Sequence, residues 1–171
     1  MDMGIHCIDL LQYISGAQAE SVCCFAQNQT FGYTAEDSAA LLMKMNTGAT
    51  AYVDSNFNIP DNAAKCRMEF YGTKGSILAE GTISQVESGK IELTLSDDLA
   101  EYNAKQDRDA KDSKNVEVVT GNMYEKEITS FANAILNNTE PEITAEEAIL
   151  VQRIVEEAYV ASDEGVCRAI R

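Results

Sequence analysis

Residues 38–57 read SAALLMKM, NTG and ATAYVDSNF, and this stretch determines the fold class. In residues 38–45 the side chains at odd positions, from Leu41 to Met45, are apolar and share one side of an extended chain. Residues 46–48 are a turn signal, and residues 49–57 alternate again. The pattern predicts a β-hairpin with one buried face, made by Leu41, Met43, Met45, Ala51, Val53, Ser55 and Phe57.

The segments around this hairpin predict more strands in the middle of the chain and helices at both ends. We expect helices over 3–14, 124–135 and about 144–165, from their apolar spacing of three and four. We expect further strands over 19–29, 65–71, 76–79, 83–86, 90–96, 116–119 and 166–170. Many strands with few helices between them indicate an α+β fold, with an open, mainly antiparallel sheet and helices packed on one face.

The 171 residues are enough for one domain with a substantial core, and we expect a single domain over 1–171. Residues 97–115 are highly charged and predict a mobile loop. Thr144 and Glu147 have the spacing of a capping box at the start of the last helix. Apolar stripes on the two closing helices predict that these side chains are core: Tyr124, Phe131, Ala148, Val151, Val155 and Ala158.

The formal charge of −15 excludes the usual nucleic-acid and anionic-membrane partners, because 13 basic residues face 28 acidic ones. No apolar run approaches the roughly 20 residues of a transmembrane helix, and the N-terminus has no basic region of a secretory signal. We therefore expect a cytoplasmic protein. The five cysteines form no CxxC pair, so reduced and mostly buried thiols are expected: Cys7, Cys23, Cys24, Cys66 and Cys167.

The only histidine, His6, stands beside two carboxylates on the first predicted helix. Asp2 precedes it by four residues and Asp9 follows it by three, so a helix places all three side chains on one face. The positive end of the helix dipole disfavours a charged imidazolium. A neutral histidine oriented by a carboxylate can act as a general base toward an alcohol. On spacing alone, a surface or boundary histidine without catalytic function is the better interpretation, and a metal site using Asp2, His6, Cys7 and Asp9 fits least well.

Several motifs resemble one known family. Residues 2–16, DMGIHCIDLLQYISG, resemble the D-x-G-x-H-x-x-D-L-L-x-x-L-x-G segment of the glucose–fructose oxidoreductase/inositol dehydrogenase/MocA (Gfo/Idh/MocA) family. Residues 36–49 look like that family's E-D-x-A hairpin, and residues 68–76, MEFYGTKGS, look like its E-I-Y-G-T-K-G-S turn. The closing helix pair is also similar, so the resemblance runs from residue 2 to about 170.

The resemblance implies the C-terminal, substrate-side domain of an NAD- or NADP-dependent oxidoreductase that acts on a sugar, a polyol or a related hydroxyl compound. It implies that His6 transfers the proton and that Asp2 binds substrate or His6, with Asp9 as a further substrate-binding candidate. It also implies that a Rossmann domain binds the cofactor and supplies a lysine from an E-K-P motif. This chain has neither G-x-G-x-x-G nor E-K-P, so we expect no cofactor site in it and no activity from it alone.

The same resemblance implies a homo-oligomer formed through the open face of the sheet, where the hairpin carries Thr50, Tyr52, Asp54 and Asn56. Two alternatives stay open. The chain could be a stand-alone oligomerisation or carbohydrate-binding module without catalysis, or a family member that uses its cofactor for another reaction, such as glycoside cleavage. Gly72 and Gly75 are expected to permit a turn, and Lys74 to be a solvated turn residue.

Overall fold

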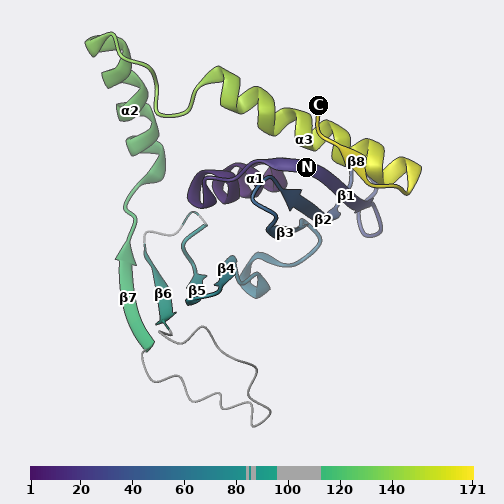
Figure 1. The fold of residues 1–171 in the computed structure, drawn as a ribbon, viewed down its shortest axis with the longest axis horizontal. Helices are drawn as coiled ribbons and strands as arrows, with labels where there is room; N and C mark the ends of the chain where they lie inside the picture. The colour runs from purple at the N-terminus through teal and green to yellow at the C-terminus, as the bar shows by residue number, and fades with distance from the viewer. Residues whose placement is uncertain (84, 86–87, 96–112) are drawn as a thin grey trace. The chain divides into compact units, whose positions relative to one another are not determined.

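The computed structural model describes residues 1–83, 85, 88–95 and 113–171, which form two compact units. Unit 1 contains residues 1–62 and 140–171, and unit 2 contains residues 63–139. The α+β class and the antiparallel sheets are confirmed (Figure 1). The elements are α1 (Asp2–Ser15), β1 (Ala19–Gln27), β2 (Ser38–Met45), β3 (Thr50–Asn56), η1 (Asp61–Ala63), β4 (Arg67–Gly72), β5 (Gly75–Glu80), β6 (Ser88–Leu95), β7 (Ser113–Val119), α2 (Met123–Asn137), α3 (Ala145–Glu164) and β8 (Arg168–Ala169).

The predicted hairpin is the centre of unit 1, where it forms β2 and β3 of a four-stranded antiparallel sheet in the order β3-β2-β1-β8. Leu41 pairs with Val53 of β3 and with Cys24 of β1, so one buried row crosses three strands. The expected alternation of buried and exposed side chains is confirmed along both β2 and β3. Phe57 is the exception, because it lies beyond the end of β3 and is exposed.

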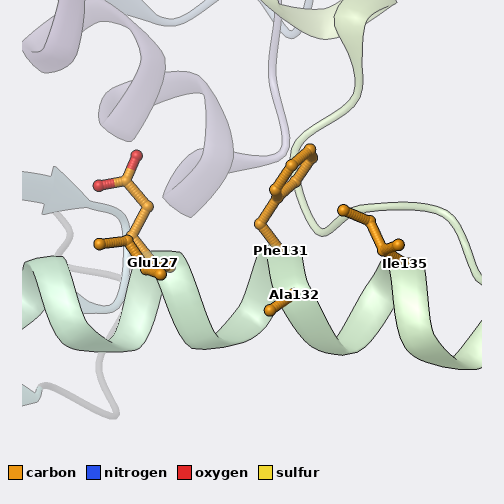
Figure 2. A pocket seen from close by; sticks show the side chains of 5 residues that line it. Glu127, Phe131, Ala132 and Ile135 are labelled. Atoms are coloured by element: carbon orange, nitrogen blue, oxygen red, sulfur yellow. The ribbon is translucent and has the colours of Figure 1, made fainter.

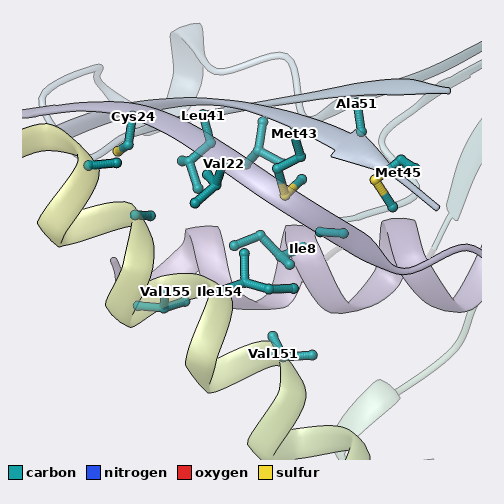
Figure 3. Close-up of a cluster of buried hydrophobic side chains, with 14 of the residues drawn as sticks. Ile8, Val22, Cys24, Leu41, Met43, Met45, Ala51, Val151, Ile154 and Val155 are labelled. Atoms are coloured by element: carbon teal, nitrogen blue, oxygen red, sulfur yellow. The ribbon is translucent and has the colours of Figure 1, made fainter. Parts of the chain in front are cut away.

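Helices α1 and α3 supply the rest of the unit 1 core, as Figure 3 shows. Ile8 of α1 and Ile154 of α3 are almost completely buried in the same cluster as Val22, Leu41 and Met43. The predicted capping box between Thr144 and Glu147 starts α3 and is confirmed. The expected burial of Ala148 is wrong, since the first turns of α3 are exposed and its buried residues begin at Val151.

A disulfide joins Cys23 of β1 to Cys167, which corrects the expectation that these thiols are reduced. The two residues are 144 positions apart in the sequence, and they meet because β8 pairs antiparallel with β1. Spacing along the chain could not show this, because the pair is created by the return of the C-terminal segment to the sheet edge. Cys7, Cys24 and Cys66 form no disulfide.

Unit 2 contains a second antiparallel sheet in the order β4-β5-β6-β7. One row across its four strands alternates in charge, because Arg67 pairs with Glu80, Glu80 with Lys90, and Lys90 with Glu117. Such opposite-charge neighbours stabilise cross-strand pairing. The adjacent row, on the other face, is apolar and consists of Met68, Ala79, Ile91 and Val116.

The predicted turn between β4 and β5 is confirmed, and it depends on Gly75. That residue has a φ of 143°, and an added Cβ would lie 2.0 Å from the carbonyl oxygen of Thr94. The strand expected over 83–86 is absent at Ile83 and Gln85, whereas residues 84, 86 and 87 lie outside the described residues. The loop expected over 97–115 also lies outside them up to residue 112, and residues 113–115 belong instead to β7.

The apolar stripe of α2 is exposed, so the expectation that Tyr124 and Phe131 are core residues is wrong. Their side chains are 52% and 60% exposed. A hollow of about 400 Å³ is lined by Glu127, Ile128, Phe131, Ala132 and Ile135. Figure 2 shows Glu127, Phe131 and Ile135 projecting from the same side of α2. Periodicity predicts that a helix has an apolar face, but it does not show which element covers that face.

Candidate active site

The candidate site is the first two turns of α1. The helix begins at Asp2 and ends at Gly16, whose φ of 63° is the left-handed conformation that terminates many helices. Gly4 and Ile8 are its buried residues and face the core of unit 1. A Cβ added at Gly4 would lie 3.7 Å from Cβ of Ser55, at the end of β3. That distance is an ordinary contact, so the helix packs against this end of the sheet, and the closest group to an added Cβ is the Met1 side chain, at 2.7 Å.

The structure places the three predicted site residues together on the other side of α1. Asp2 and His6 are exposed, and Asp9 is partly exposed. Their spacing of four and three residues puts them on one helical face. Within the described residues, the imidazole of His6 makes no hydrogen bond to either carboxylate, so it is accessible to another molecule. The proposed catalytic use of this face stays a prediction.

A polar cluster that sequence reasoning missed lies at the start of α1. Tyr159 of α3 donates a 2.8 Å hydrogen bond to Glu36, and the Met1 amine contacts both residues. Burial, the bond to Glu36 and the charges of Glu36 and Cys24 raise the pKa of Tyr159 to about 12. Burial opposes ionisation of Glu36, but its hydrogen bonds to Met1 and Tyr159 outweigh this effect and lower its pKa.

A second polar cluster organises the segment between β1 and β2. Asp37 is 1% exposed, and its Oδ2 accepts hydrogen bonds from the backbone N–H groups of Gln29, Thr30 and Phe31 at 3.1, 2.6 and 3.2 Å. Burial opposes its ionisation, but these backbone donors prevail and lower the pKa of Asp37. Asn58, after β3, donates to Oδ1 of Asp37 at 3.4 Å. An ionised Asp37 therefore connects two loops at one end of the sheet.

In the sequence, Glu36 and Asp37 are recognisable only as part of a hairpin motif. Two adjacent acidic residues immediately before a buried strand were the available signal, because buried carboxylates need hydrogen-bond donors close by. The partners could not be identified, since Tyr159 is 123 residues from Glu36. Within the described residues, no group of three or more His, Cys, Asp or Glu side chains is arranged to hold a metal ion.

None of the helices in the described part of the chain has both the length and the apolar composition needed to cross a bilayer. The helix starts of α2 and α3 also do not fit a dinucleotide phosphate. Asn122 caps α2 and Thr144 caps α3, and carboxylates occupy the first turns, at Glu125, Glu146 and Glu147. The two capping side chains accept hydrogen bonds from N–H groups that a phosphate would need, and the carboxylates repel the negative charge of a phosphate.

Comparison with protein families matches residues 1–78 to the GFO/IDH/MocA C-terminal domain. Among curated proteins, the chain is similar to the "Uncharacterized oxidoreductase YrbE" of Bacillus subtilis (strain 168), with 27% identity over 163 residues. That alignment covers 92% of this chain and 44% of the relative. The chain thus spans less than half the length of the curated relative that it matches.

Solved structures of oxidoreductases share this fold over nearly the whole chain. Aldose-aldose oxidoreductase from Caulobacter crescentus, complexed with glycerol, has a TM-score of 0.77 at 19% identity and matches 97% of this chain and 45% of its own. Levoglucosan dehydrogenase in complex with NADH and L-sorbose has a TM-score of 0.74 at 14% identity, over 99% of this chain and 49% of its own. At these identities the likeness shows the fold.

Proposed function

Because residues 1–78 match the GFO/IDH/MocA C-terminal domain, we propose that the chain is the substrate-side domain of an NAD- or NADP-dependent oxidoreductase. Its substrate is a sugar, a polyol or a related hydroxyl compound. The curated relative is an oxidoreductase by name, and two structural neighbours carry NADH, one of them with L-sorbose. These names support the reaction class, and the arrangement on α1 supports the residues.

The nicotinamide cofactor, in this proposal, is bound by a separate N-terminal nucleotide-binding domain. The chain contains no G-x-G-x-x-G motif, and its capped, acidic helix starts at α2 and α3 do not fit a pyrophosphate. The chain also covers only 44% of the YrbE sequence, 45% of the aldose-aldose oxidoreductase and 49% of levoglucosan dehydrogenase. Both observations support a protein in which a second domain binds the hydride acceptor, while this one binds the substrate and supplies the proton acceptor.

His6 is the proposed general base. Its imidazole takes the proton from a substrate hydroxyl as the carbon that bears this hydroxyl is oxidised. Asp2 and Asp9 flank His6 on the same face, where either carboxylate can orient the ring or accept a substrate hydroxyl. After transfer, these carboxylates stabilise the positive charge on the imidazolium.

The observation that carries this proposal is the exposure of Asp2, His6 and Asp9 on one face of a helix whose opposite face is fixed in the core by Gly4 and Ile8. A rigid helix with an exposed histidine and two carboxylates can offer a proton acceptor at a defined position to a second domain. Exposure of His6 excludes a packing role, and the turnover test below separates catalysis from a surface histidine without function.

The test is turnover by the two-domain protein with His6→Ala. We expect kcat to fall by about 10²–10⁴-fold, the usual contribution of general acid–base catalysis. Tyr13→Phe is the control, because Tyr13 is exposed on the same helix and the substitution removes only its hydroxyl. Equal turnover by the His6→Ala and Tyr13→Phe proteins would refute the assignment of His6.

We also propose that copies of the chain associate through the outer face of the unit 1 sheet. Phe25, Leu42 and Tyr52 are 71%, 49% and 60% exposed on this face, opposite the face that carries the core. Leu42 and Tyr52 are direct cross-strand partners, so their side chains form a continuous apolar row. An exposed apolar sheet face of this kind is typical of a surface that a partner covers.

A further inference from the structure

We propose that Phe31 and Tyr33 form an aromatic platform that binds the ring face of a neutral cyclic sugar or cyclitol at the edge of the α1 site. This inference rests on the proposed function and deepens it, because it names two residues that select a ring-shaped substrate over an open-chain one. The loop between β1 and β2 carries both aromatic side chains, and no part of the proposed proton transfer uses them.

The backbone of this loop is held in one conformation by polar contacts from inside the unit. Asp37 accepts hydrogen bonds from three consecutive N–H groups, ending with that of Phe31. The side-chain amide of Asn28 donates to the carbonyl oxygens of Tyr33 and Ala35. The residues on either side of Gly32 are thus fixed by groups that do not involve the aromatic rings.

The two rings stack on each other while both stay half exposed. Their centroids are 5.5 Å apart with an interplanar angle of 23°, and the residues are 45% and 47% exposed. Stacked aromatic rings normally contribute most when they are buried in a core or an interface. A fixed loop that presents a stacked pair to solvent therefore has the form of a preorganised binding surface, since little conformational freedom is lost when a ligand covers it.

This platform lies at the same end of the unit 1 sheet as the first turn of α1. Gly4 packs against Ser55 at the end of β3, two residues before His6. Three residues after Ser55, Asn58 donates a 3.4 Å hydrogen bond to Thr30, which directly precedes Phe31. Glu36, at the other end of the loop, contacts Met1 at the start of the helix. Contacts at both ends of the loop therefore connect the platform to the candidate site.

The chemistry of these groups selects a neutral ring. The face of an aromatic ring carries partial negative charge, which attracts the weakly positive C–H groups on the flat side of a pyranose or cyclitol. An open-chain polyol presents no such flat set of C–H groups. The carboxylates of Asp2, Glu36 and Asp37 and the chain's net charge of −15 oppose a phosphorylated sugar. Thr30 and Asn58 provide neutral hydrogen-bonding groups beside the rings for hydroxyls.

Binding to the 171-residue chain tests the platform without turnover. Saturation-transfer NMR would compare two ring probes, myo-inositol and D-glucose, with the open-chain probe D-sorbitol. We expect saturable binding of at least one ring probe, weakened about three- to tenfold by Phe31→Leu and again by Tyr33→Leu. Leucine keeps the apolar volume of each side chain but removes the flat ring. Tyr71→Leu is the control, because Tyr71 is an exposed tyrosine of unit 2.

Three results would overturn the platform: no saturable binding of either ring probe, equal binding of D-sorbitol, or binding that both leucine variants retain. Turnover by the two-domain protein separates this outcome from failure of the proposed function. If His6→Ala abolishes oxidation while the leucine variants keep the KM for the ring probe, only the platform fails. If ring binding depends on Phe31 and Tyr33 but the two-domain protein oxidises no hydroxyl compound, only the oxidoreductase assignment fails.

Discussion

The hydroxyl of Tyr159 donates a 2.8 Å hydrogen bond to Glu36, although the two residues are 123 positions apart in the chain. This bond joins α3 to the segment that leads into β2. Glu36 is 14% exposed at its side chain and is the immediate neighbour of the buried Asp37. The pair therefore links the closing helix, the loop between β1 and β2 and the start of α1, which are the parts that surround the candidate site.

Removing this bond should cost measurable stability. Tyr159→Phe keeps the ring and deletes the donor, so we expect the free energy of unfolding at pH 7 to fall by about 1 kcal/mol, the net value of a typical hydrogen bond. Tyr71→Phe is the control, since the Tyr71 hydroxyl also donates a 2.8 Å bond to a glutamate but is exposed. Urea unfolding of both variants measures the difference, and equal losses would contradict the proposed contribution of the Tyr159 bond.

Asp37 should make the stability of unit 1 depend on pH. Its pKa is lower in the folded chain than its ordinary value of 3.8, because three backbone N–H groups outweigh the effect of burial. A lowered pKa stabilises the fold above 3.8, and that stabilisation is lost as the pH falls below 3.8. The stability difference between wild type and Asp37→Asn should shrink in this range. Urea titrations from neutral to strongly acid pH test it, and a constant difference would be the opposite result.

The disulfide between Cys23 and Cys167 should stabilise the chain by about 2–5 kcal/mol, because it closes a very long loop in the unfolded state. Reduction with a dithiol should lower the melting temperature of wild type but not that of the Cys23→Ser, Cys167→Ser double variant. Cys66→Ser, which removes a free thiol, is the control and should respond to reductant as wild type does. A wild-type melting temperature unaffected by reductant would show that the bond contributes nothing.

If copies of the chain associate through the outer face of the unit 1 sheet, a charged residue on that face should lower the mass of the particle in solution. Phe25→Asp should shift the chain to a monomer in light scattering at micromolar concentration, because a buried, unpaired carboxylate opposes the interface. Val119→Asp is the matched control, since Val119 is 82% exposed and lies on β7 of unit 2. A wild-type chain that is already monomeric, or a Phe25→Asp oligomer of unchanged mass, would refute this interface.

The sequence predicted most of what depends on local periodicity. The hairpin of β2 and β3, the capped start of α3 and the shared face of Asp2 and His6 follow from spacings of two, three or four residues. The sequence did not reveal contacts between residues that are far apart along the chain, namely Cys23 with Cys167 and Glu36 with Tyr159. It also predicted a core position for Phe131, because an apolar stripe does not reveal whether another element covers it.

The pH dependence of kcat/KM is the sharpest test of His6 as the general base. For the two-domain protein with a ring substrate, we expect a loss of activity on the acid side, since a protonated general base cannot accept the substrate proton. The residual activity of His6→Ala should lack this limb. An acid limb of the same midpoint and slope in His6→Ala would show that another group accepts the proton, and His6 would then not be the base.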